Sequence, residues 1–163
     1  MKLRNVLLVS FFAAMALVFN LAESSLPMPM PGMKLGAANI FSLAALVLLG
    51  TREAFAVTLL RAALSWLISA NFFALICSLA GGLLATAVMA LLYNKFKEYF
   101  SLPWISVSGA WAFNTAQTIA AAAIVGDMRI MLYLIPLLIA GTAAGWAVGL
   151  LAELICRRLY LRR

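Results

Sequence analysis

The chain has 163 residues, of which 66% are hydrophobic and only 10% charged, and its net charge is +7. This composition excludes a soluble globular protein and predicts one all-α integral membrane domain over residues 1–163. The Lys and Arg residues cluster near the ends of apolar segments, as membrane anchors do, so we expect no nucleic-acid partner. The chain has no His, and Cys77 and Cys156 lack metal-ligand spacing, so we expect no metal and no cofactor.

Residues that break helices divide the apolar sequence into six segments. The predicted helices lie near residues 5–22, 35–50, 53–70, 72–93, 104–126 and 130–156. The second is short for a membrane span, and Asn71 is the natural turn residue between the third and the fourth. We therefore predict a bundle of six transmembrane helices.

The distribution of Lys and Arg predicts the orientation of this bundle, because cytoplasmic ends carry the excess of positive charge. With a cytoplasmic N-terminus, nine of these residues lie inside and two, Lys34 and Arg129, lie outside. Both termini are then cytoplasmic. In an alternative interpretation, residues 6–21 form the core of a signal peptide cleaved after Ala22, although Asn20 fits poorly in such a site.

The predicted external loop, residues 23–34, carries three prolines at alternate positions and three methionines. Prolines hold the backbone extended, and methionines make adaptable apolar contacts. We expect this loop to form a lid, with Glu23 and Lys34 able to pair with each other or to reach the space beneath. An ordinary proline-rich connection is the alternative.

Arg61 lies in the middle of the third predicted helix, where a charge at bilayer mid-depth is expensive. Helical spacing places Thr58, Arg61 and Ser65 on one face. Such charges almost always face a protein interior or a water-filled cavity, which makes Arg61 a candidate ligand-binding residue. The alternative is an arginine that reaches the membrane surface or pairs with a carboxylate to hold helices together.

Ser42 in the second predicted helix and Gln117 in the fifth lie at the same predicted depth as Arg61. Asn39 lies one turn above Ser42, Asn114 lies three residues deeper than Gln117, and Trp111 and Thr118 flank the same stripe. Polar groups in hydrocarbon need partners, so we predict that the three faces line one cavity open to the outside. Alternatively, these side chains serve only as hydrogen bonds between helices.

The last predicted helix carries the pattern Gly141-x-x-x-Gly145-x-x-x-Gly149, which is typical of close helix contacts. The sequence leaves open whether that contact lies within the bundle or with a partner. Pro136 predicts a kink near Leu132, since it removes one helical hydrogen bond.

Catalytic signatures are missing from the sequence. Asp127 is the only aspartate, whereas a prenyl diphosphate synthase needs paired aspartate-rich motifs to hold magnesium against diphosphate. We therefore expect that the chain is not an enzyme. Any uphill transport would take its energy from another subunit or from an ion gradient.

Several short segments are distinctive. They are Glu23-Ser-Ser-Leu-Pro27, Gly32-Met-Lys34-Leu-Gly36-Ala-Ala-Asn39, Gly50-Thr-Arg52-Glu53-Ala54, Arg61, Gly81-Gly82, Ser106-Val-Ser108-Gly109-Ala110 and Asn114-x-x-Gln117. Together they resemble the Gx transporter family, which is also catalogued as heptaprenyl diphosphate synthase component I. The resemblance extends over nearly the whole chain and is most specific around Lys34, Gly36 and Asn39.

That family looks like the substrate-binding (S) components of energy-coupling factor transporters. The resemblance implies a multi-pass protein of the bacterial cytoplasmic membrane with an outward pocket under the loop after its first helix. It also implies a transmembrane scaffold subunit and two ATPase subunits as partners. S components commonly dock through an Ala-x-x-x-Ala pattern on the first helix, and Ser10-x-x-x-Ala14 is the closest match here.

We therefore expect an uptake subunit that binds a small molecule between the second, third and fifth helices. Arg61 would meet an anionic or strongly accepting group, and Trp111 would offer a stacking surface. The expected ligand-binding residues are Glu23, Lys34, Asn39, Ser42, Arg61, Ser65, Trp111, Asn114 and Gln117. One alternative is a non-catalytic membrane partner of a prenyl diphosphate synthase or of a redox assembly in isoprenoid quinone metabolism. Another is a self-sufficient carrier, but the two halves show no inverted repeat.

Overall fold

The computed structural model describes residues 3–24, 36 and 38–160, and within these ranges every regular element is helical. The elements are α1 (Leu3–Ser24), α2 (Asn39–Leu48), α3 (Thr51–Ser69), α4 (Phe72–Phe96), α5 (Leu102–Val125), the 3₁₀ helix η1 (Met128–Tyr133) and α6 (Leu134–Tyr160). The predicted all-helical class is confirmed for this part of the chain. Most of the predicted external loop, Lys34 included, lies outside the described residues.

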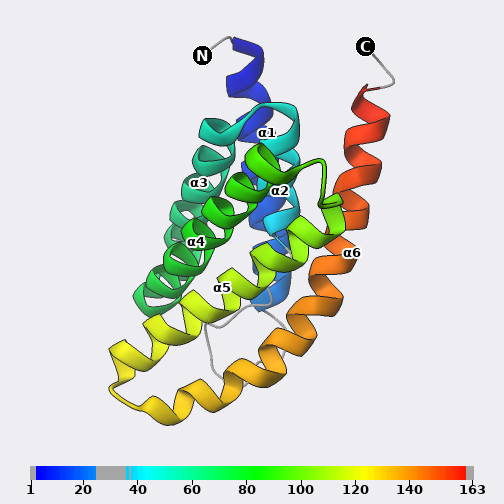
Figure 1. Cartoon of the computed structure of the whole chain (residues 1–163). Helices are drawn as coiled ribbons and strands as arrows, with labels where there is room; N and C mark the ends of the chain where they lie inside the picture. Colours follow the sequence, from blue (N-terminus) through cyan, green and yellow to red (C-terminus); the bar gives the residue numbers. More distant parts are fainter. Residues whose placement is uncertain (1–2, 25–35, 37, 161–163) are drawn as a thin grey trace.

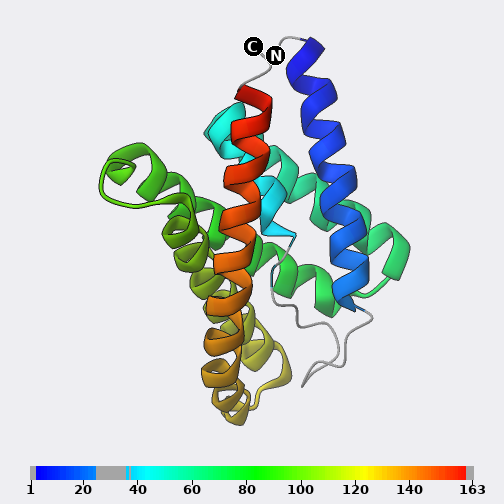
Figure 2. The same ribbon diagram turned by 90° about the vertical axis from the view of Figure 1, so that its right-hand side faces the viewer.

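The helices form an elongated bundle in which α1 begins and α6 ends at the same end (Figures 1 and 2). We call this the terminal end and the opposite one the distal end. The α2–α3 and α4–α5 connections lie at the terminal end, whereas the α3–α4 and α5–η1 turns lie at the distal end (Figure 1). As a result α1, α3 and α5 run toward the distal end, and α2, α4 and α6 run back.

The short helix α2 forms the centre of the bundle and contacts every other α-helix. Its residues from Asn39 to Leu46 are all buried. A helix that is apolar on every side is stable only when protein or lipid surrounds it completely, and the α2 sequence, Asn-Ile-Phe-Ser-Leu-Ala-Ala-Leu-Val-Leu, has that character. Its two polar side chains, Asn39 and Ser42, therefore point into the protein interior.

Two predicted boundaries are wrong. Helix α2 begins at Asn39, not at residue 35, and just before it Gly36 has a φ of +88°, which is incompatible with an α-helical start. The last helix begins at Leu134 after the separate turn η1, not at residue 130. Pro136 then falls in the first turn of α6, where a backbone N–H needs no helical partner, so no mid-helix kink arises near Leu132.

The predicted turn at Asn71 is confirmed. Its side-chain oxygen accepts a hydrogen bond from the backbone N–H of Ala74 at 2.9 Å and so caps α4. Directly before it, Ala70 has a left-handed φ of +50°, which ends α3. The two helices therefore form the tight antiparallel pair that the sequence predicts.

The glycines of α6 make the close helix contact that their spacing predicts, and the neighbour is α5. A Cβ atom on Gly145 would lie 2.9 Å from the Cα of Val107, and one on Gly149 would overlap the Cα of Pro103. Both obstacles are backbone atoms, which cannot move aside. This glycine face is therefore a seam within the bundle.

Three helical segments are long and apolar enough to cross a membrane: Leu3–Glu23, Phe72–Phe96 and Met128–Arg158. Helix α2 is apolar but short. Helices α3 and α5, which are not among the three, carry much of the buried polar set, including Arg61, Asn114 and Gln117. These three polar side chains face the protein interior.

Candidate functional site

A chain of hydroxyl groups links three helices in the bundle interior. The side-chain oxygens of Ser42 on α2 and Thr58 on α3 are 2.8 Å apart, and Thr58 is also 2.8 Å from the hydroxyl of Thr86 on α4. Thr58 additionally donates to the carbonyl of Ala54 at 3.1 Å. All three hydroxyl-bearing residues are fully buried, so these bonds fix the relative rotation of α2, α3 and α4.

The hydrogen bond between Ser42 and Thr58 places Arg61 and Asn39 at one level of the bundle. Helix α3 runs toward the distal end, so Arg61 lies one turn distal to Thr58. Helix α2 runs the other way, so Asn39 lies one turn distal to Ser42. Three residues rise about 4.5 Å along a helix in each case. The two residues therefore lie in the same layer, one turn to the distal side of the hydroxyl chain.

Arg61 is the largest fully buried side chain among the described residues, with 1% of its surface exposed. A Cβ atom on Gly82 of α4 would lie 2.8 Å from both Nη2 of Arg61 and Cγ2 of Thr58, so only glycine leaves room for the guanidinium there. Glu23, near the end of α1 and 5% exposed, interacts electrostatically with Arg61. Within the described ranges, Nε and Nη2 of Arg61 have no hydrogen-bond partner.

Helix α1 joins this region through Asn20. The hydroxyl of Ser65, one turn distal to Arg61, donates to Oδ1 of Asn20 at 3.0 Å, and both residues are buried. Glu23 follows Asn20 by three residues, which places it on the same face of α1. The α1 face that meets α3 thus carries an amide and a carboxylate at the distal side of the guanidinium.

Helix α5 contributes a second polar group. The amide of Gln117 donates to Oδ1 of Asn114 at 2.9 Å, and Asn114 donates to the carbonyl of Leu137 on α6 at 3.0 Å. The hydroxyl of Thr118 donates to the carbonyl of Asn114 at 2.7 Å. Gly141 leaves the space for the Asn114 amide, because a Cβ there would overlap its Nδ2.

Asn39 on α2 is another buried side chain with open hydrogen-bonding capacity. It is 4% exposed, and neither its Oδ1 nor its Nδ2 has a partner in the part of the chain that the structure describes. It lines a narrow crevice with Gly36, Ser106 and Gly145 that has no room for a water molecule. An amide held dry and unpaired is costly, by about 1–3 kcal/mol.

Six of the predicted ligand-binding residues that lie on helices α2, α3 and α5 are buried in the interior. They are Asn39, Ser42, Arg61, Ser65, Asn114 and Gln117. Glu23 joins them from α1, whereas Lys34 lies outside the described residues. Trp111 lies apart on the outer surface, 46% exposed, where its Nε1–H donates to the hydroxyl of Thr142 at 2.9 Å.

Other residues of this region were not among the predicted site residues. Asn20 sits in an apolar segment, and only its partner Ser65 reveals its place in the site. Gly82 and Thr86 share a face of α4 because they are four residues apart, and from that spacing the sequence could have predicted that both belong to this region. The predicted docking residues Ser10 and Ala14 both lie on the exposed face of α1.

The buried polar side chains of this region are hydrogen-bonding groups and one charged pair of residues, Arg61 and Glu23. Among the described residues no group of three or more Cys, Asp or Glu side chains could hold a metal ion. The interior contains one guanidinium, several amides and several hydroxyls, of which Nε and Nη2 of Arg61 and the amide of Asn39 have no hydrogen-bond partner among the described residues. Guanidinium and amide N–H groups can donate to a molecule that carries hydrogen-bond acceptors.

The family of the chain follows from its sequence match. The model of the family described as heptaprenyl diphosphate synthase component I matches residues 12–155. The chain belongs to this family. The match includes every buried polar residue described above, and the resemblance to that family is thereby confirmed. No curated protein and no solved structure matches the chain.

Proposed function

We propose that this component I protein is the substrate-binding subunit of an ATP-driven uptake transporter of the energy-coupling factor type. The observation that carries the proposal is the guanidinium of Arg61, buried in the bundle with Nε and Nη2 unpartnered among the described residues. A bound molecule with acceptor atoms would supply the missing bonds. The neighbouring amide of Asn39, also without a hydrogen-bond partner there, would fix its orientation.

The energetics favour a ligand over a purely structural role for Arg61. A buried charge is strongly unfavourable unless it is paired and its N–H groups are hydrogen-bonded. Glu23 offsets part of that cost through its opposite charge. Two nitrogen atoms of Arg61, Nε and Nη2, still lack acceptors within the described ranges, and buried unsatisfied groups of this kind are rare in native proteins.

The distribution of charge supports an orientation with both termini in the cytoplasm. The described basic residues near the terminal end are Arg4, Arg52, Lys95, Lys97, Arg157 and Arg158. Arg129 alone follows α5 at the distal end within those ranges. By the positive-inside rule, the terminal end is cytoplasmic. A ligand would therefore reach the layer that contains Arg61 and Asn39, which we call the Arg61 layer, from outside. All six α-helices then cross or enter the bilayer.

The transporter would be incomplete without partners. The sequence has no phosphate-binding loop, so ATP hydrolysis would come from two ATPase subunits, coupled through a transmembrane scaffold subunit. The exposed face of α1 that carries Ser10 and Ala14 is our candidate surface for that scaffold. Small residues let a partner helix approach closely in a membrane.

A second candidate function is favoured by the family description. A component I of heptaprenyl diphosphate synthase would be a non-catalytic membrane partner that anchors or regulates the synthase, or a redox assembly of isoprenoid quinone metabolism. In that case the partner is a soluble prenyl-transferring enzyme, and ATPases play no part.

Purification of the tagged chain from its native membranes in mild detergent separates the two candidates. Recovery of a scaffold protein with two ATPases supports the transporter, whereas recovery of a prenyl diphosphate synthase without ATPases contradicts it. The variant Ala14→Leu should lose the scaffold by steric overlap at α1. Ala87→Leu, at an alanine on α4 that is also exposed, is the matched control and should keep the scaffold.

A further inference from the structure

The hydroxyl of Ser78 on α4 is a buried polar group without a hydrogen-bond partner in the described part of the chain. The side chain is 4% exposed, and its Oγ bonds to no described residue. Other hydroxyls in these helices, those of Thr58, Ser108, Thr118 and Thr142, each donate to the backbone carbonyl four residues earlier at 2.7–3.1 Å. Ser78 does not make this bond. Because buried groups without partners are costly and rare in native proteins, Ser78 is a candidate contact for a bound molecule.

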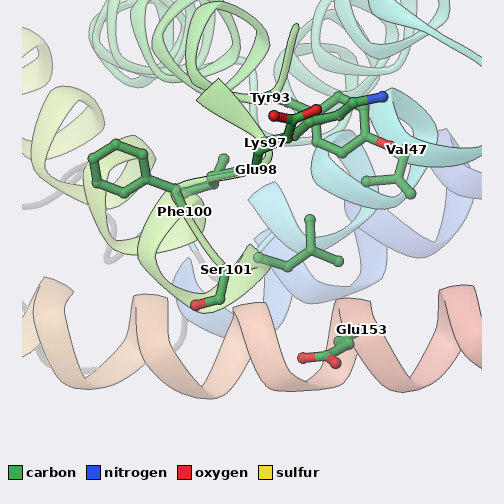
Figure 3. A pocket seen from close by; sticks show the side chains of 9 residues that line it. Val47, Tyr93, Lys97, Glu98, Phe100, Ser101 and Glu153 are labelled. Atoms are coloured by element: carbon green, nitrogen blue, oxygen red, sulfur yellow. The ribbon is translucent and has the colours of Figure 1, made fainter. Parts of the chain in front are cut away.

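The cavity at the terminal end, in contrast, is lined by charged groups that water can reach. It has a volume of about 440 Å³ and lies between α6 and the α4–α5 connection, where Figure 3 shows Glu153 of α6 across from Ser101. Its charged side chains, Lys97, Glu98 and Glu153, are at least partly exposed. The buried hydroxyl of Ser78 is therefore the stronger indication of a ligand.

Ser78 lies one helical turn distal to the guanidinium of Arg61. Gly82 fixes the level of α4, because a Cβ atom there would lie 2.8 Å from Nη2 of Arg61. Helix α4 runs from the distal to the terminal end, so Ser78, four residues before Gly82, lies about 6 Å farther toward the distal end. Ser65 on α3 lies at a similar level, since it follows Arg61 by four residues. One small molecule could therefore contact both Arg61 and Ser78.

The Ser78 side chain points between α3 and α5. The face of α4 that carries Gly82 meets α3, and the face that carries Gly81 meets α5, where a Cβ atom would lie 2.9 Å from Cδ2 of Phe113. Successive residues of a helix are about 100° apart, so Ser78 falls between these two faces. Helix α2 begins at Asn39 in the Arg61 layer, so no residue of α2 lies at the level of Ser78. Ser78 thus faces the bundle axis beyond the start of α2.

We propose that Ser78 is a second contact for the molecule that binds Arg61, an inference that rests on the proposed function. Such a molecule carries an acceptor at the guanidinium and a second oxygen or nitrogen atom about 6 Å farther toward the distal end. The hydroxyl of Ser78 can donate to that atom or accept from it. The substrate class is an elongated polar organic molecule, because an inorganic ion such as phosphate is too small to contact both residues.

The test begins with mass spectrometry of the unmodified protein purified in mild detergent, which identifies the retained molecule. That molecule is removed by dialysis and titrated back in a calorimeter. Ser78→Ala should bind it with a Kd about 2- to 10-fold higher than that of the unmodified protein, the effect of one lost hydrogen bond between neutral groups. The matched control is Ser108→Ala, which removes a hydroxyl that donates to its own helix and should keep the unmodified Kd.

Melting of the dialysed proteins separates a binding role of the hydroxyl from a structural one. Ser78→Ala should melt at or above the temperature of the unmodified protein, because it breaks no hydrogen bond between described residues. Thr86→Val removes a partnered hydroxyl on the same helix and should melt about 2–4 °C lower. An equal loss for Ser78→Ala would overturn the proposal, since the hydroxyl would then have a structural partner.

The binding data also distinguish failure of this proposal from failure of the proposed function. An unchanged Kd for Ser78→Ala, with binding lost in Arg61→Met, would overturn the contact at Ser78 and leave the proposed function in place. Retention of inorganic phosphate alone would have the same consequence. If the unmodified protein retains no small molecule, both proposals are contradicted.

Discussion

The combined replacement Glu23→Gln and Arg61→Met separates a binding role for the buried charges from a structural one. It removes both charges at nearly constant side-chain volume. Replacing a buried ion pair by neutral groups is commonly neutral or stabilising, by about 1–4 kcal/mol. For a chain of this size, each kcal/mol corresponds to about 2–4 °C in the melting temperature. The ligand-free double variant should therefore melt at or above the temperature of the unmodified protein.

In the same double variant, the affinity for the ligand should fall although the melting temperature does not. Loss of a hydrogen bond to a charged group costs about 1.5–3 kcal/mol, so affinity should fall by about 10-fold to more than 100-fold. Arg61→Lys keeps the charge but lacks the planar fork, and it should bind with intermediate affinity. Thermal melting in detergent and mass spectrometry of the retained ligand measure the two effects. A double variant that loses more than about 3 kcal/mol of stability and still retains the ligand would refute the reasoning.

Three further predictions concern Gly82 beside Arg61, the contact between α5 and α6, and the orientation in the membrane. Gly82→Ala should lower stability by about 1–3 kcal/mol through overpacking, and part of that loss should be absent when Arg61 is already methionine, as a double-mutant cycle of melting temperatures would reveal. Gly145→Leu should prevent α6 from packing on α5 and abolish expression of folded protein in size-exclusion chromatography. Ala143→Leu, on the exposed side of the same helix, should not. A cysteine at Asp127 should react with a membrane-impermeant maleimide in intact cells, and protection there would contradict the proposed orientation.

The sequence predicts much of the bundle and of its polar interior because helical periodicity is a local property. Spacings of three and four residues place Thr58, Arg61 and Ser65 on one face, and a membrane helix must turn such a face inward. The structure buries all three. The inward polar face of α3 could therefore be predicted without knowledge of the fold.

The sequence alone did not predict which residues of different helices contact each other. Spacing identifies the face that carries Ser65, but only the packing of α1 against α3 makes Asn20 its partner. For the same reason, the sequence did not predict the space that Gly82 leaves for the guanidinium of Arg61. A glycine's role depends on the side chain that approaches it from another helix.

The polar face predicted for the fifth helix was too wide, because it extended to Trp111. Trp111 and Gln117 are six residues apart, which separates them by about 120° around the helix. Asn114 lies between them, so a polar stripe read from the sequence includes all three. In the bundle, Asn114 and Gln117 face the interior, and Trp111 turns outward to Thr142.

The central claim is that the Arg61 layer holds a small molecule with hydrogen-bond acceptors. Mass spectrometry of the unmodified protein and of Arg61→Met, both purified in mild detergent from the same host, tests it most directly. We expect one small molecule to remain with the unmodified protein at near-stoichiometric amounts and to be absent from the variant. The same molecule retained equally by both proteins would contradict the account.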